Sequence, residues 1–254
     1  MIKEERHARI CDYLEKHQFA AINTLMEYIG ASKSTIRRDL LELREAQKIE
    51  FVRGGASSIN KRITPESPYQ VKQNMNAAEK ERIGKAAAEL IHEGETVYLA
   101  GGTTTKALLP YLDQLTQLNL VTNDIIIGMN VADRENISLT MTGGTLRPKY
   151  YALRGILAED SMRTMKIGMA FLSCDAIDVQ SGCYIANADE VGLLRQVIES
   201  SNYVVLMADH SKFYSSAFIS FCTMAQVDMV ISDTGLNEEI RVALRKKNIK
   251  FVLA

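Results

Sequence analysis

The stretch of residues 20–56 constrains the fold of this chain more than any other part of the sequence. Apolar residues at helical spacing predict a short helix over 22–29 and a second helix over 33–46. Gly30 lies between them and allows a sharp turn, because glycine adopts positive φ without a Cβ clash. Ser32 is a natural N-cap for the second helix. The apolar positions are Leu25, Met26 and Ile29 in the first helix and Ile36, Leu40 and Leu43 in the second. This pattern predicts a helix-turn-helix.

The polar face of the second helix carries three cationic and two hydroxyl side chains, namely Lys33, Ser34, Thr35, Arg37 and Arg38. Such a face suits a helix in the major groove of double-stranded DNA, where guanidinium groups reach guanine edges or phosphates. The alternative is an ordinary solvated helix with scattered charges. The turn before the helix and the ribbon after it favour the DNA-binding interpretation.

A glycine-ended ribbon follows the second helix. Residues 49–52 and 56–59 predict two short strands, and Gly54 and Gly55 supply the turn between them. The helix pair and this hairpin together predict a winged helix-turn-helix. The residues predicted to contact DNA are Lys33, Ser34, Thr35, Arg37, Arg38, Arg53, Gly54 and Gly55.

The rest of the chain divides at a change of composition. A helix over 3–16 is expected to complete a three-helix core, which places the predicted DNA-binding domain at 1–59. Residues 60–76 are polar, contain Pro65 and Pro68, and show little periodicity, so they are predicted to form a linker. Residues 77–254 are predicted to form a larger domain.

Length and charge agree with two domains. At 254 residues and 46% hydrophobic composition, the chain is long enough to bury a sizeable core. The net charge is −1 overall, but residues 1–62 hold 12 basic against 9 acidic residues. The basic excess is modest, so DNA affinity should come from a local patch and from self-association more than from bulk charge.

The cysteines and the apolar segments exclude several classes of protein. Cys11, Cys174, Cys183 and Cys222 lie far apart in the sequence without metal-binding spacing, so we expect reduced thiols, no metal site and no cofactor. No apolar run is long enough to cross a membrane, and the first residues lack a signal-peptide core. These features predict a cytoplasmic protein without a membrane partner.

The second domain alternates strands and helices. A helix is expected from residue 77 to Gly94, with Glu79, Lys80, Glu81 and Arg82 solvated. Strands are predicted over 96–99, 119–122, 137–141, 169–173, 203–207, 229–232 and 250–253. Helices are predicted over 105–112, 125–132, 155–165, 189–200 and 237–247. This order indicates an α/β fold with a mainly parallel sheet and helices on both of its faces.

Small and polar residues follow several of these strands. In open α/β sheets, ligands bind beyond the carboxyl ends of the strands, so these loops predict one polar crevice. A cation there would bind phosphate and carboxylates would bind sugar hydroxyl groups. The alternative is that each loop is simply solvated. The loops contain Gly101 to Thr105, Thr122 and Asn123, Gly143 to Arg147, Asp175 and Asp178, and Asp209 to Lys212.

The segment Ser32-Lys33-Ser34-Thr35-Ile36-Arg37-Arg38-Asp39-Leu40, with Gly54-Gly55-Ala56 after it, resembles the DeoR-type transcriptional regulators of bacteria. The resemblance continues through the strand-end loops along nearly the whole chain. Four positions depart from the family pattern: Phe51 and Arg53 stand where Arg and His are usual, Ala100 replaces an Asp, and Ala176 replaces a Gly. The loss of a carboxylate at Ala100 implies one fewer contact to a sugar hydroxyl group.

The resemblance implies a repressor of a sugar-metabolism operon that binds double-stranded operator DNA. It also implies that the second domain resembles ribose-phosphate isomerase-like folds and binds a phosphorylated sugar or a related effector. A homodimer or homotetramer is expected, because a symmetric pair of recognition helices reads two half-sites. The residues predicted to bind the effector are Gly102, Thr103, Thr104, Thr105, Asn123, Gly143, Gly144, Arg147, Asp175 and Lys212.

An alternative function is isomerisation of an aldose phosphate. That reaction needs a base to move a proton between adjacent carbons and a cation to stabilise the enediolate. Asp175, Glu190 and Lys212 are the residues that fit those roles. We expect a regulator and no enzyme, because a shared fold says little about chemistry.

Overall fold

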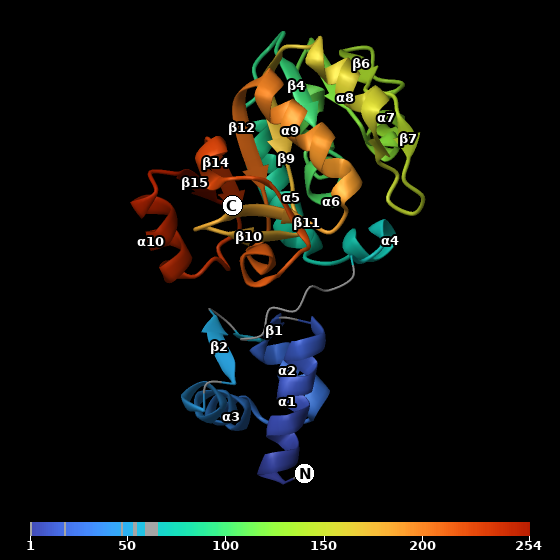
Figure 1. The fold of residues 1–254 in the computed structure, drawn as a ribbon. Coiled ribbons are helices and arrows are strands. Elements are labelled where there is room, and N and C mark those ends of the chain that lie inside the picture. Colours follow the sequence, from blue (N-terminus) through green and yellow to red (C-terminus); the bar gives the residue numbers. More distant parts are fainter. Residues whose placement is uncertain (1, 18, 47, 53–54, 59–65) are drawn as a thin grey trace.

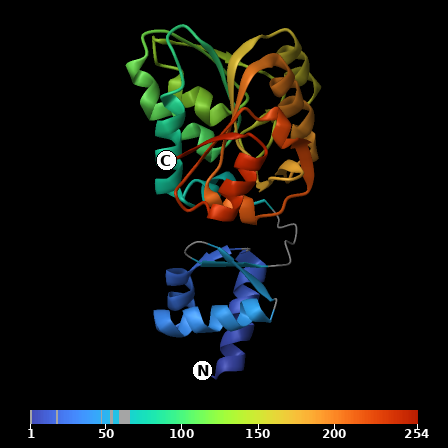
Figure 2. The same cartoon turned by 90° about the vertical axis from the view of Figure 1, so that its left-hand side faces the viewer.

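The computed structural model describes residues 2–17, 19–46, 48–52, 55–58 and 66–254. The described residues form a small N-terminal unit and a larger α/β body (Figures 1 and 2). The N-terminal unit contains three helices, α1 (Lys3–His17), α2 (Ile22–Ile29) and α3 (Lys33–Glu45). Its three strands are β1 (Phe19–Ala21), β2 (Ile49–Val52) and β3 (Gly55–Ser58), which form an antiparallel sheet in the order β1-β3-β2.

The helix pair forms as the sequence predicts. Gly30 takes φ 72°, and its amide donates to the carbonyl of Met26 at the end of α2. The Ser32 hydroxyl accepts from the amide of Thr35 at 3.3 Å and so caps α3. The apolar faces of α1, α2 and α3 meet in one core around Leu14, Leu25 and Leu40. Strand β1 is not predicted, because three residues are too few to show a period.

A buried ion pair ties α1 to α3. Asp39 is 2% exposed, and its two carboxylate oxygens accept from Arg6 at 2.7 and 2.8 Å. His7 approaches the same carboxylate at 3.1 Å. Burial alone would raise the pKa of Asp39, but the adjacent Arg6 guanidinium outweighs burial and holds this pKa below its ordinary value. The pair orients α3 against α1.

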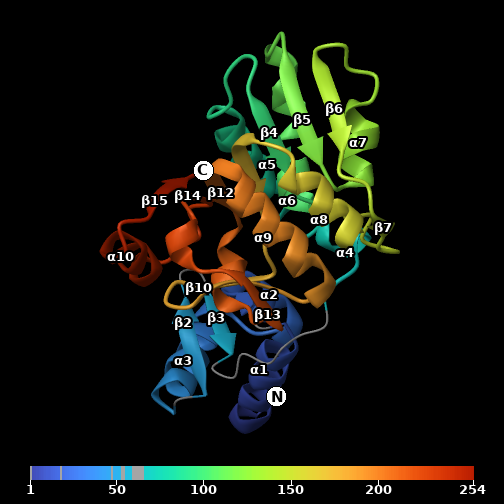
Figure 3. The same ribbon diagram turned by 45° about the horizontal axis from the view of Figure 1, so that its top comes forward.

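The body is built on a seven-stranded parallel sheet in the order β15-β14-β12-β9-β4-β5-β6. Figure 3 shows β4, β5 and β6 side by side. The strands are β4 (Thr96–Leu99), β5 (Leu118–Thr122), β6 (Ile137–Met141), β9 (Ile167–Leu172), β12 (Ser201–Met207), β14 (Met229–Ser232) and β15 (Lys250–Leu253). The predicted α/β class and parallel sheet are confirmed.

Helices cover both faces of this sheet. Helices α5 (Ala77–Ala88) and α7 (Ile125–Val131), with the 3-10 helix η1 (Leu109–Gln114), pack on one face. Helices α8 (Ile156–Arg163), α9 (Val191–Ser200) and α10 (Glu238–Lys246) pack on the other. The helix predicted over 105–112 is instead the short α6 (Thr103–Lys106) followed by η1, because Pro110 has no amide to continue the hydrogen-bond ladder.

The sequence does not predict several short elements of the body. Strands β10 (Ala176–Asp178), β11 (Gly182–Ile185) and β13 (Ile219–Cys222) form an antiparallel sheet. Strands β7 (Thr145–Leu146) and β8 (Leu153–Arg154) form a hairpin, and α4 (Tyr69–Lys72) lies within the predicted linker. The remaining 3-10 helices are η2 (Ala188–Glu190), η3 (His210–Tyr214) and η4 (Met224–Gln226). Figure 1 shows β10, β11 and α4 at the end of the body nearest the N-terminal unit.

The two units touch through the ring of Phe19. Its centroid lies 5.4 Å from that of His210 and 6.1 Å from that of Tyr214, both in η3. The His210 ring is fixed by Asp233 at 2.8 Å. Helix η3 therefore contacts the N-terminal unit with these two rings.

Candidate functional site

The N-terminal part of α3 presents a cationic surface. Lys33, Ser34, Arg37 and Arg38 are exposed and Thr35 is half-buried, while Ile36 and Leu40 on the opposite face are fully buried. Lys33, Arg37 and Arg38 form no ion pair within the part of the chain that the structure describes. Three positive charges without internal partners are therefore available to an anionic partner, as DNA recognition requires.

Of the three residues predicted to contact DNA from the wing, the structure describes only Gly55. Arg53 and Gly54 lie outside the described residues. Gly55 is buried in the central strand β3, opposite Ala21 and Val52. A Cβ atom at Gly55 would lie 2.0 Å from the carbonyl oxygen of Ala20. Gly55 therefore permits close packing of two strands, and the structure does not place it at an exposed turn.

A polar cavity lies where the strand order reverses. The chain begins the sheet at β4, adds β5 and β6 on one side, and then crosses to β9 on the other. Such a switch point opens a crevice between neighbouring loops at the carboxyl ends of the strands. Six of the predicted effector residues line this one cavity: Gly102, Thr103, Thr104, Asn123, Asp175 and Lys212.

Four predicted residues do not line it. Thr105 is fully buried, and its hydroxyl donates to the carbonyls of Ala100 and Gly102. Gly143 and Gly144 follow β6, which is an edge strand two positions from the switch point. Arg147 is not part of the lining either, but its ion pairs reach two residues that are.

The glycine loop after β4 is held by side chains. The amide of Gly101 donates to Asn123 Oδ1 at 2.8 Å, and the amide of Gly102 donates to Asp124 Oδ2 at 3.1 Å. Asn123 is itself fixed by the hydroxyl of Tyr98 at 2.9 Å. These two amides already have partners, so they are not free to donate to an anion in the cavity.

Two of those cationic side chains have no carboxylate partner. Lys80 and Lys212 line the cavity, and neither forms an ion pair with any residue in the described ranges. Lys80 is only 5% exposed, and its ammonium donates to the carbonyl of Lys72. Burial lowers the pKa of Lys80 to about 8. A buried ammonium without a counter-ion is costly, and a bound anion would offset that cost.

The expectation that Lys80 is solvated is wrong. Lys80 shares the inner face of α5 with Ile83, Gly84, Ala87 and Ala88, all of which are buried. Spacing alone could have shown this, because Lys80, Ile83, Gly84 and Ala87 fall at i, i+3, i+4 and i+7. The charged neighbours of Lys80 in sequence conceal that spacing.

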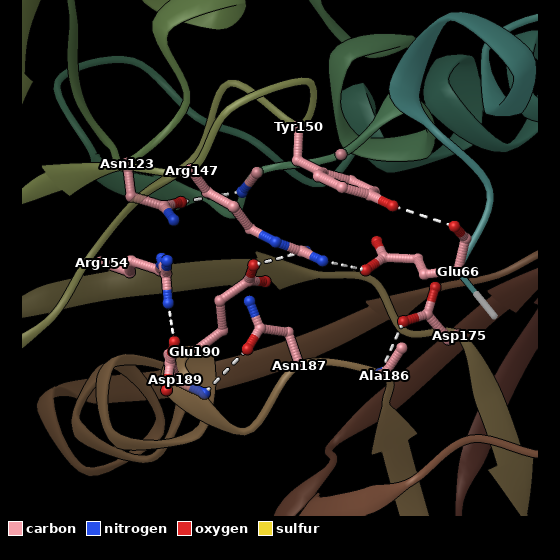
Figure 4. A network of polar contacts seen from close by, with 12 residues as sticks. Glu66, Asn123, Arg147, Tyr150, Arg154, Asp175, Ala186, Asn187, Asp189 and Glu190 are labelled. Carbon is pink, nitrogen blue, oxygen red and sulfur yellow. Dashed lines mark hydrogen bonds and ion pairs between the residues drawn. The ribbon is translucent and has the colours of Figure 1, made fainter.

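An ion-pair network closes one side of the cavity (Figure 4). Arg147 binds Glu66 at 2.5 Å and Glu190 at 2.8 Å. Lys72 binds Glu66 at 2.6 Å and Asp175 at 2.7 Å. Burial would raise the pKa of Asp175, but Lys72 outweighs it and lowers that pKa. Burial raises the pKa of Glu190 in spite of Arg147, and the nearby Glu66 and Asp175 add to the rise.

Glu66 and Lys72 come from the predicted linker, where no periodicity indicates a site. They are held in place by the loop after β7. The carbonyl of Glu66 accepts from the hydroxyl of Tyr150 at 2.9 Å, and the Tyr150 ring lies 3.6 Å from the Arg147 guanidinium. Lys149 and Tyr151 in this loop have positive φ of 68° and 62°, a conformation that costs energy for side chains other than glycine.

The described residues contain no helix long and apolar enough to span a membrane. They also contain no cluster of three or more His, Cys, Asp or Glu side chains with the geometry of a metal site.

An exposed cationic helix in a helix-turn-helix, joined to an α/β body with a polar cavity, defines a DNA-binding regulator with a sensor domain. Comparison with known proteins identifies the family. A DeoR-like helix-turn-helix domain matches residues 6–62, and a DeoR C-terminal sensor domain matches residues 75–234. The chain belongs to the DeoR family of transcriptional regulators, which confirms the resemblance found in the sequence.

Two of the similar proteins match nearly the whole chain. The HTH-type transcriptional regulator GlpR of Haloferax volcanii is 31% identical over 252 residues, covering 99% of this chain and 98% of that protein. The transcriptional repressor AccR of Agrobacterium fabrum is 32% identical, covering 99% of this chain and 97% of that protein. Ribose 5-phosphate isomerase A of Methanocaldococcus jannaschii matches 54% of this chain and 55% of its own, with 17% identity and a TM-score of 0.40.

Proposed function

We propose that this protein is a repressor that binds operator DNA as a homodimer or homotetramer, with α3 in the major groove. The bases and phosphates of the DNA would be contacted by Lys33, Ser34, Thr35, Arg37 and Arg38. The DNA backbone would also be contacted by Arg53 and Gly54 of the wing. The exposure of the cationic side chains of α3 supports this assignment, as does their lack of internal partners among the described residues. Two symmetric copies would place two such helices on two half-sites.

We further propose that a phosphorylated sugar or a related metabolite binds in the cavity of the body and controls DNA binding. The observation that carries this proposal is the pair of cavity ammonium groups, Lys80 and Lys212, that have no carboxylate partner in the described structure. They would bind the phosphate. Asn123, Thr103 and Asp175 would contact the sugar hydroxyl groups, since amide, hydroxyl and carboxylate groups bind them well.

A thermal-shift screen tests the effector assignment. A ligand that binds only the folded state raises the melting temperature by mass action. Sugar phosphates are compared with the same sugars without phosphate, in wild-type protein and in Lys212→Met. We expect a shift that requires both the phosphate and Lys212. A shift of equal size with the unphosphorylated sugars would contradict the role of the ammonium groups.

DNA binding is tested with a duplex that the wild-type protein selects from a random library. Binding to this duplex, followed by fluorescence anisotropy, should respond to the sugar phosphate that gives the largest thermal shift. A ligand that stabilises the protein and leaves its DNA affinity unchanged would be no effector.

A further inference from the structure

We propose that the carboxylate of Glu66 occupies the place of an anionic group of the effector, and that effector binding displaces it and releases the segment 66–68, called here the strap. This inference rests on the proposed function and specifies how the cavity is regulated. It identifies a residue of the chain itself as the competitor of the ligand.

The geometry of Glu66 is that of a bound anion. One carboxylate oxygen contacts the Lys72 ammonium at 2.6 Å. The other contacts the Arg147 guanidinium at 2.5 Å (Figure 4). A phosphate or carboxylate of a ligand would bind these two cations in the same way. The Glu66 side chain is 10% exposed and that of Arg147 is 14% exposed, so solvent screens the contact only in part.

The two cations do not depend on Glu66 for their positions. Lys72 also binds Asp175, and Arg147 also binds Glu190 and stacks on Tyr150. Asp175 is fixed in turn by the amide of Ala186 at 2.9 Å. Removal of the Glu66 carboxylate would therefore leave a preformed pair of cations at the side of the cavity.

The like charges of this network favour the competition. Glu66, Asp175 and Glu190 place three carboxylates around the two cations of this network. An additional anion at Lys72 and Arg147 would meet like charges at short range unless one carboxylate left. Asp175 follows β9 and Glu190 ends η2, so both belong to the body. Glu66 belongs to the strap, so it is the carboxylate that can leave without disturbing the sheet.

The strap links the cavity to the DNA-binding domain. Seven residues of sequence separate Glu66 from Ser58, the last residue of β3. Besides the Glu66 carboxylate, the strap is held by the hydrogen bond that the Tyr150 hydroxyl donates to the Glu66 carbonyl at 2.9 Å. Tyr69, which follows the strap, has its own anchors: its amide donates to the carbonyl of Lys149 and its ring packs against Tyr151. An effector that displaces Glu66 would thus loosen the attachment of the winged helix, which gives the ligand a preference between two arrangements.

The test uses the full-length protein and inorganic phosphate as the probe. Glu66→Gln removes the charge and keeps the shape, so it should bind phosphate at least about fivefold more tightly than wild type, the lower end of typical coupling between sites. Asp113→Asn is the matched control, since Asp113 forms one ion pair with Arg134 at 2.7 Å outside the cavity. The control should bind phosphate as wild type does.

Hydrogen exchange in wild-type protein gives a second measurement that needs no variant. Saturating phosphate should increase exchange at the amides of Glu66 and Ser67, since Pro68 has no amide hydrogen, and leave the central strand β9 unchanged. If wild type and Glu66→Gln bind phosphate equally and exchange in the strap does not change, the competition is excluded while the anion site stands. If phosphate binds to neither protein, the anion site itself fails, and with it the proposed function of the cavity.

Discussion

The cationic side chains of the DNA-binding face and those of the cavity differ in whether the protein pairs them with its own carboxylates. The cations of α3 come from one short stretch of sequence, and Arg37 and Arg38 are exposed without internal partners in the described structure. The cavity and the ion-pair network beside it take their cations from distant segments, and two of these cations, Lys72 and Arg147, are paired with internal carboxylates. An open cationic surface suits a partner that brings its own phosphates. A compensated network suits a ligand that must replace an existing contact.

Loss of the recognition-helix charges should produce the largest effect. In the double variant Arg37→Ala/Arg38→Ala we expect duplex affinity to fall by about 30-fold or more, since each bidentate base contact contributes about 1–3 kcal/mol. The salt dependence of binding should also become shallower. Anisotropy over a salt series measures both effects. Arg163→Ala, an exposed arginine of α8, is the control, and undiminished binding by the double variant would remove α3 from the interface.

Loss of a cavity cation should have the next largest effect. Lys212→Met is expected to weaken binding of the sugar phosphate by at least about tenfold, because a hydrogen bond to a charged group contributes about 1.5–3 kcal/mol. Binding to the selected duplex without ligand should stay at the wild-type level. Calorimetric titration of the ligand and anisotropy on the duplex separate the two properties. A variant that loses both would show that Lys212 supports the fold and not the ligand.

The pH dependence of ligand binding sharpens the comparison further. Because burial lowers the pKa of Lys80 to about 8, this group loses its proton as pH rises through that value. Affinity for a sugar phosphate should therefore fall about tenfold between pH 7 and pH 9, while the phosphate itself is already a dianion.

Lys80 also affects stability, in the opposite direction. Between about pH 8 and the ordinary lysine value of 10.5, the unfolded chain binds a proton that the folded chain has lost, so the free energy of unfolding rises with pH. Denaturant titrations at several pH values measure the rise, and Lys80→Met should abolish it. In the binding experiment, an affinity for the sugar phosphate that stays constant between pH 7 and pH 9 would show that Lys80 does not contact the anion.

The smallest effect is expected at the cap of α3. Ser32→Ala removes the hydroxyl that accepts from Thr35, which should lower the stability of the helix-turn-helix by about 1 kcal/mol. Ser34→Ala is the comparison variant: Ser34 lies inside the helix, and its hydroxyl contacts that of Ser32 at 3.0 Å but is not the cap of α3. Thermal unfolding followed by circular dichroism compares the two variants. Equal destabilisation would show that the cap does not define the start of α3.

The sequence predicts the two regions unequally. The bounds of α2 and the start of α3 follow from local spacing, Gly30 and Ser32, so they can be predicted almost to the residue. The strands of the parallel sheet are short apolar runs, and four of the seven match their predicted bounds. Strands β10, β11 and β13 are missed, because short antiparallel strands among loops show no clear period.

The cavity is predicted only as far as topology allows. The loops after β4, β5, β9 and β12 converge as polar strand ends suggest, whereas Gly143 and Gly144 do not, because β6 lies at the edge of the sheet. Strand order depends on contacts between segments that are far apart in the sequence, so local sequence patterns do not predict it. Glu66 and Lys72 escape detection for the same reason, since their partners Arg147 and Asp175 are 81 and 103 residues away.

The position of Glu66 so soon after β3 sets a geometric limit on the regulator. Eight residues of extended chain span at most about 26–29 Å, so with Glu66 docked the end of β3 stays within that radius of the cavity. Two half-sites one helical turn apart are separated by about 34–36 Å. In the symmetric pair proposed above, the docked arrangement would keep each winged helix within this distance of the cavity of its own subunit. The length of the tether would then limit how far the two recognition helices can move apart.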